Sequence, residues 1–127
     1  MRGISVSDRD EEMLAGKILA FAGEKNPGIP TRGGRDAEER AYRRWQGYML
    51  AQGGLFAVGI KKNHPQISSY ELEQIIEGEI ERRGIYGEEA LLFSEGVNNH
   101  ALIGMEFAEW KKQKTLAAES KTETSVS

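Results

Sequence analysis

Apolar residues recur at helical spacing over most of the chain, and this pattern predicts an all-α fold of four to five helices in a single small domain. The first helix is expected to begin near Ser7, because the acidic residues that follow favour the positive end of a helix dipole. Leu14 and Ile18 belong to its apolar face. Four glycines and two prolines within residues 23–35 then exclude a continuous helix.

A second helix is expected from Asp36 to about Gln52. Gly53 and Gly54 follow, and this pair of glycines either ends the helix or kinks it. The apolar run at residues 55–60 is too short for its periodicity to distinguish a buried strand from a buried helix. A short extended segment therefore remains possible there.

Three more helices are expected over residues 68–83, 88–95 and 99–114. The first of these has the best-marked start in the chain, because Ser68 and Glu71 have the spacing of a capping box. Glycines end the first two, and an asparagine precedes the third as its expected cap.

The last helix is apolar on two sides. Phe107 and Trp110 lie on one stripe, whereas Leu102 and Met105 belong to another. A helix that is apolar nearly all round is usually enclosed by its own domain or by a partner subunit. We therefore expect these four side chains to anchor an interface, since large buried side chains dominate binding energy.

Residues 115–127 are small and polar and include no aromatic residue. Such a segment buries too little apolar surface to offset the entropy of ordering it. The composition predicts a helical domain over residues 1–114 followed by a flexible polar C-terminal tail.

The chain has 127 residues, a mass of 14.1 kDa, a formal net charge of −3 and no cysteine. Absence of cysteine excludes disulfides, thiolate metal sites and thiol nucleophiles. No apolar run approaches the ~18 residues of a membrane span, and the polar N-terminus lacks the apolar core of a signal peptide. We expect a cytoplasmic protein that has no cofactor, no metal and no membrane partner.

Two residues are candidates for acid–base chemistry. Glu79 falls inside the apolar sector of its helix, where burial would raise its pKa, but Arg83 follows four residues later and favours a structural ion pair. His100 starts the last helix beside an apolar stripe. An enzyme built on Glu79 and His100 requires that both residues share a pocket, and we do not expect one.

A second hypothesis rests on a cluster of arginines interleaved with aromatic residues, a combination suited to phosphates and stacked bases. Neighbouring acids and the net negative charge argue against nucleic acid as the partner. The cluster comprises Arg32, Arg35, Arg40, Arg43 and Arg44.

Together these patterns favour a non-enzymatic interaction or assembly protein that forms a homo-oligomer or binds another protein. Small accessory, structural or inhibitory proteins of bacteriophages share this general profile. Nucleic-acid binding through the arginine cluster and catalysis by Glu79 and His100 remain the alternatives.

Overall fold

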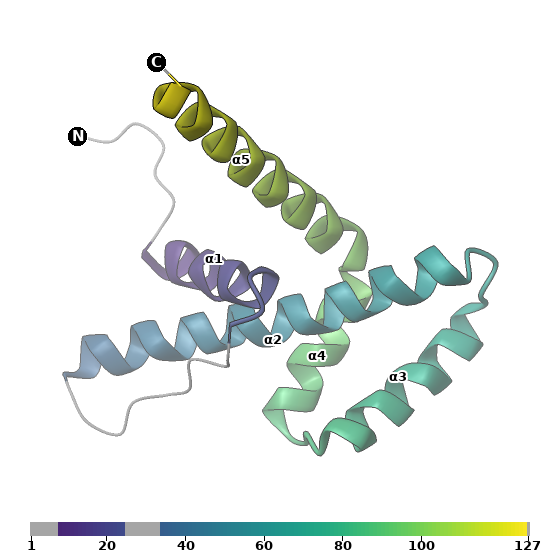
Figure 1. Ribbon diagram of the computed structural model, residues 1–127. Coiled ribbons are helices and arrows are strands. Elements are labelled where there is room, and N and C mark those ends of the chain that lie inside the picture. Colours follow the sequence, from purple (N-terminus) through teal and green to yellow (C-terminus); the bar gives the residue numbers. More distant parts are fainter. Residues whose placement is uncertain (1–7, 25–33, 127) are drawn as a thin grey trace.

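The computed structural model describes residues 8–24 and 34–126, with side chains described for residues 11–24 and 34–118. This part of the chain contains five helices and no strand, which confirms the all-α prediction (Figure 1). The helices are α1 (Asp8–Phe21), α2 (Arg35–Asn63), α3 (Ser69–Arg83), α4 (Glu88–Asn98) and α5 (His100–Val126).

Helix α2 is the centre of the molecule, and both α1 and α4 pack along it (Figure 1). Residues early in α1 contact residues early in α2, and later residues contact later ones. Glu12 forms an ion pair with Arg44, and Ala20 packs in one cluster with Ala51. The two helices therefore run in the same direction.

Helix α4 follows α2 in the same direction on another side. The Tyr42 hydroxyl donates a hydrogen bond to Glu88 near the start of α4, and Val97 near its end packs in one cluster with Ala57. Phe93, which is fully buried, lies at the centre of this contact.

Glycines make these close contacts possible. A Cβ atom added to Gly53 would lie 1.9 Å from the carbonyl oxygen of Phe93, and one added to Gly96 would lie 1.9 Å from that of Leu50. At Gly47, on the α1 side of α2, the added atom would lie 1.9 Å from the Met13 carbonyl oxygen. Any side chain would therefore push the backbones apart.

For Gly53 and Gly54 the alternative of a helix end is therefore wrong, and so is the predicted end of α4 before Gly96. Gly53 and Gly54 neither end α2 nor mark its boundary, since the helix continues through residues 55–60 to Asn63. The possible extended segment at residues 55–60 is helical. Likewise α4 does not stop before Gly96 but includes it. Burial against a neighbouring backbone outweighs the low helix propensity of glycine at these positions.

The ends of α3 confirm the sequence signals. The Glu71 amide donates to the Ser68 hydroxyl over 3.1 Å, and the Ser68 amide donates to the Glu71 carboxylate over 3.4 Å. Gly84 ends the helix in the left-handed conformation, with φ of 69°. The side chain of Asn99, expected to cap α5, instead donates to the Glu95 carbonyl and so satisfies the end of α4.

Helix α5 is longer than predicted. It continues past Lys114 to Val126 and projects from the rest of the molecule (Figure 1). The side chains of residues 111–118 are all exposed. The division of the chain into a domain and a flexible tail stays a prediction.

Candidate functional site

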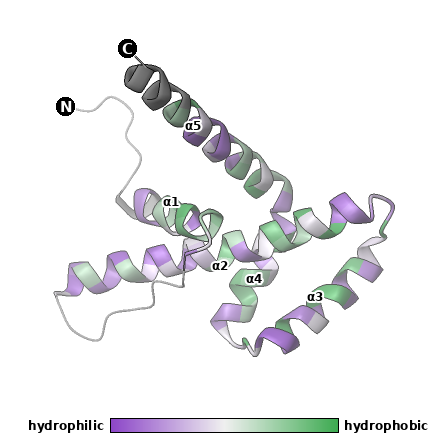
Figure 2. Ribbon diagram, viewed as in Figure 1, coloured by the Kyte–Doolittle hydropathy of each residue, from purple (hydrophilic) through white to green (hydrophobic). Residues whose placement is uncertain are grey.

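An apolar groove of about 480 Å³ lies between α1 and the first half of α5. Four large apolar side chains line it and remain exposed, with Leu14 at 45%, Ile18 at 37%, Leu102 at 56% and Met105 at 69% of full exposure. Apolar and polar residues alternate along α1 and along the first half of α5 (Figure 2). We call this surface the α1–α5 groove.

The inner side of α5 positions the groove by packing on the core. Ile103 is 2% exposed and lies against Gly54 of α2, where an added Cβ atom would come within 2.6 Å of its side chain. Phe107 and Trp110 pack on Phe21 of α1, with ring centroids 5.3 and 6.0 Å away. These contacts leave the opposite side of α5 without cover among the described residues.

The four predicted interface residues therefore separate into two pairs. Leu102 and Met105 point outward and line the groove. Phe107 is half-buried in the aromatic cluster with Phe21, and Trp110 belongs to both the cluster and the wall of the groove. Their part in an interface stays a prediction.

An ion pair ties the two walls of the groove together. The Lys17 ammonium of α1 lies 3.1 Å from a carboxylate oxygen of Glu106 on α5. Both side chains are mostly shielded from water, at 16% and 29% exposed, so solvent screens this pair less than a surface pair. It fixes the spacing of α1 and α5, and with it the width of the groove.

Leu14 and Ile18 are the residues whose role the sequence does not reveal. Their spacing placed them on the apolar face of the first helix, but nothing in the sequence indicates what that face contacts. In the structure α1 contacts α2 mainly through the close approach of Gly16 and Gly47, and this contact leaves Leu14 and Ile18 beside α5.

Glu79 forms ion pairs with two arginines of its own helix. Its carboxylate accepts hydrogen bonds from the guanidinium groups of Arg82, at 2.9 and 2.5 Å, and Arg83, at 2.6 Å. The hydrogen bond from Arg82, together with that from Arg83, lowers the pKa of Glu79 to about 2. The alternative of a raised pKa for acid catalysis is wrong, and the expected pair with Arg83 is confirmed.

Arg83 also ties α3 to the other helices. Its guanidinium lies 4.8 Å from the ring centroid of Phe93 in α4 and donates to the side chain of Gln52 in α2 over 3.2 Å. A planar cation stacks on an aromatic face while its edge donates hydrogen bonds. Burial of Glu79 thus orients the arginine that ties α3 to its neighbours.

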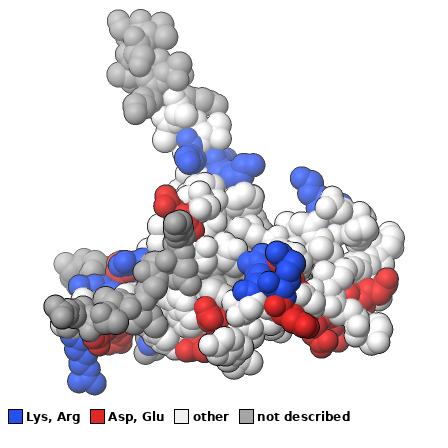
Figure 3. Space-filling model, turned by 60° about the horizontal axis from the view of Figure 1, so that its bottom comes forward, with Lys and Arg blue, Asp and Glu red and all other residues white. Residues whose placement is uncertain are grey.

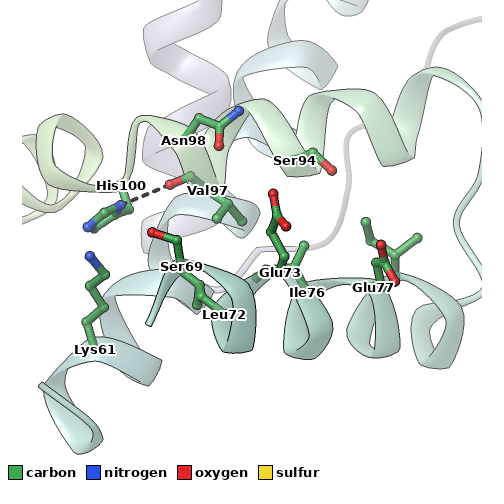
Figure 4. Close-up of a pocket in the computed structure, with 11 residues that line it drawn as sticks. Lys61, Ser69, Leu72, Glu73, Ile76, Glu77, Ser94, Val97, Asn98 and His100 are labelled. Atoms are coloured by element: carbon green, nitrogen blue, oxygen red, sulfur yellow. Dashed lines mark hydrogen bonds between the residues drawn. The ribbon is translucent and has the colours of Figure 1, made fainter. Parts of the chain in front are cut away.

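His100 lies in a different place, a cleft of about 600 Å³ between α3 and α4 (Figure 4). Its Nδ1 donates to the Val97 carbonyl oxygen over 2.9 Å. Lys61 lies beside the ring, and Glu73 extends toward Ser94. Glu79 does not line this cleft, so the structure does not bring the two catalytic candidates together there.

The arginine cluster is divided among different contacts. Arg44 pairs with Glu12 over 2.8 Å, and Arg43 donates to Gln46 over 3.1 Å. Arg35 and Arg40 are exposed, whereas Arg32 lies outside the described residues. On the face drawn in Figure 3, cationic and acidic side chains lie next to one another, and neither sign forms a continuous field.

Within residues 8–24 and 34–126, no three histidine, aspartate or glutamate side chains come together as metal ligands. No described helix combines the length and hydropathy needed to cross a bilayer. Comparison of the chain with protein-family models, with curated proteins and with solved structures gives no match.

Proposed function

We propose that this protein is a non-enzymatic interaction module that self-associates through the α1–α5 groove and the adjoining outer face of α5. The observation that carries the proposal is the groove itself, where four large apolar side chains from two helices remain between 37% and 69% exposed. Single exposed apolar residues are common on proteins, but a contiguous group with a hollowed shape is typical of a binding surface.

The groove is also held in shape before any partner binds. Ile103 on Gly54, the aromatic cluster around Phe21 and the Lys17–Glu106 pair fix α5 relative to α1. A surface that needs no rearrangement loses less conformational entropy on binding. This supports docking of another folded surface in preference to a loose hydrophobic contact.

Sedimentation equilibrium of three proteins tests the proposal: the wild type, the double variant Leu102→Gln/Met105→Gln, and the control Leu91→Gln. Leu91 is 71% exposed on α4 and lies outside the groove. We expect the double variant to raise the dimer dissociation constant at least about tenfold, because two apolar anchors are lost. The control should match the wild type.

Two outcomes would refute the proposal. One is a wild type that stays monomeric at every concentration. The other is a double variant that associates as tightly as the wild type and the control, because association would then use another surface.

A further inference from the structure

The outer face of α5 carries five residues separated alternately by three and four positions. This is the spacing of a and d positions in a coiled coil, where each residue faces the partner helix. All five side chains are exposed, and we call them the α5 stripe. They are Leu102, Met105, Glu109, Lys112 and Leu116.

We propose that α5 pairs with α5 of a second copy of this chain in the antiparallel direction, with Glu109 opposite Lys112 of the partner subunit. This inference rests on the proposed self-association and specifies its geometry. In an antiparallel coiled coil, a positions face d positions of the partner helix. The pairing then places Met105 opposite Leu116 of the partner subunit as well.

Charge selects this orientation over the parallel one. A parallel pair would bring each Glu109 against its copy and each Lys112 against its copy, so that both polar layers would be repulsive. The antiparallel pair turns the same residues into two oppositely charged layers, flanked by two apolar layers. The charges in the stripe thus specify direction, whereas Met105 and Leu116 supply the apolar contact.

Contacts within the chain leave Lys112 available for this role. Lys111 lies 5.5 Å from the ring centroid of Phe107, and Lys114 lies 5.0 Å from that of Trp110, so both lysines cover the aromatic cluster of their own chain. Lys112 points to the other side, and it has no ion-pair or ring partner among the described residues. Lysine side chains gather on α5 where it leaves the body of the molecule (Figure 3).

The length of α5 is a second argument for a covering helix. Beyond Trp110 every described side chain is exposed, yet the helix continues to Val126. Because the side chains of residues 111–118 are exposed, tertiary packing adds little to the stability of this part of the helix. Pairing with a second α5 would cover residues 111–118, and the α1–α5 groove beside Met105 would extend the contact beyond the two heptads of the α5 stripe.

Disulfide trapping tests the direction of pairing, because the chain has no cysteine of its own. Three single variants are prepared in the full chain: Met105→Cys, Leu116→Cys and the exposed control Leu91→Cys. In the proposed dimer, position 105 faces position 116 of the partner subunit, but two copies of position 105 are eleven residues apart along the helix, about 16 Å. A disulfide needs Cβ atoms within roughly 4.5 Å.

We therefore expect an equimolar mixture of Met105→Cys and Leu116→Cys to give a covalent dimer on mild oxidation. Each variant alone, and Met105→Cys mixed with Leu91→Cys, should stay uncrosslinked. Crosslinking of Met105→Cys with itself would establish a parallel pair and overturn the proposal. A dimeric mass without any crosslink would overturn the α5 pairing and leave self-association standing, whereas a monomeric wild type would overturn both.

Charge reversal gives an independent readout. Glu109→Lys and Lys112→Glu should each weaken the dimer at least about fivefold at low salt, since each creates two like-charged layers. The double variant Glu109→Lys/Lys112→Glu restores opposite charges and should recover most of the wild-type affinity. If the single variants associate like the wild type, Glu109 and Lys112 do not face each other.

Discussion

The centre of α2 and the outer face of α5 differ in which residues lie closest to a neighbouring element. Along α2 the tightest contacts involve Gly47 and Gly53, whose backbone touches the backbone of α1 and α4. On α5 the large apolar side chains of Leu102 and Met105 are more than half exposed. On these two surfaces, the shape of the contact decides which residues are buried, because small glycines are enclosed and two large apolar side chains stay exposed.

This difference separates residues that stabilise the fold from residues available for binding. Where helices run in the same direction at very close range, a small residue gains more contact than a large one, because it lets the whole backbone approach. An exposed leucine or methionine stabilises the monomer little, so its substitution should affect association more than folding. Four predictions test this separation, in order of decreasing effect on the free energy of unfolding.

Gly53→Ala should destabilise the protein most, by about 3 kcal/mol or more. The added methyl group would collide with the Phe93 carbonyl, and the cost of overpacking exceeds the gain in helix propensity. Gly59→Ala in the same helix is the matched control, because nothing lies within 4 Å of its added Cβ atom. Gly59→Ala should raise the free energy of unfolding by about 0.5–1 kcal/mol, because alanine has the higher helix propensity. Denaturant unfolding followed by circular dichroism measures the stability of both variants. Equal effects of the two substitutions would contradict the close contact between Gly53 and the Phe93 carbonyl.

Glu79→Gln should lower the free energy of unfolding by about 2 kcal/mol at neutral pH, because the variant loses the charge that orients Arg82 and Arg83. The pKa of Glu79 in the folded protein is about 2, below the ordinary value of 4.5 for a glutamate side chain. Its contribution is therefore complete above about pH 4.5 and is lost as pH falls from 4.5 through 2.

Stability measured against pH checks the sign of this effect. The difference in unfolding free energy between the wild type and Glu79→Gln should become smaller as the pH falls from 4.5 to 2. The exposed control Glu73→Gln should show the same pH dependence of stability as the wild type. A difference that stays constant down to pH 2 would contradict the ionised pair.

Arg83→Lys should destabilise by about 1 kcal/mol although the charge is retained. Lysine cannot stack a planar group 4.8 Å from Phe93 while donating to both Glu79 and Gln52. Arg82→Lys is the control, because the Arg82 side chain is 71% exposed, hydrogen-bonds to Glu79 and stacks on no ring among the described residues. Thermal unfolding should show a larger drop for Arg83→Lys, and equal drops would mean that stacking contributes nothing.

Met105→Gln should change the unfolding free energy of the monomer by less than about 0.5 kcal/mol, the usual range for an exposed position. The measurement is denaturant unfolding at a protein concentration at which the chain is monomeric. Ile103→Val, two residues away on the buried side of the same helix, should lower the unfolding free energy more, by about 1 kcal/mol. A larger effect at Met105 would place it in the core.

Local signals in the sequence predicted much of the fold. The all-α class, the capping box at Ser68 and the left-handed glycine at Gly84 were correct, because each depends on residues within one helix turn. The pairing of Glu79 with Arg83 was predicted for the same reason.

The remaining features depend on contacts between distant segments. A glycine that breaks a helix and a glycine that lies under a crossing helix look alike in sequence, so the continuation of α2 beyond Gly54 could not be predicted. The groove combines Leu14 and Ile18 with residues of α5, and no local pattern places α1 beside α5. The exposure of Leu102 and Met105 likewise depends on how α5 packs against the other helices, so the sequence alone does not give it.

The central claim, that α5 presents an open face for a second copy of the chain, is tested most directly by the absolute solution mass of the wild type from light scattering over a concentration series. The account predicts a rise toward twice the chain mass of 14.1 kDa, with a midpoint that moves to higher concentration in Leu102→Gln/Met105→Gln. A mass of 14.1 kDa at every concentration would contradict it.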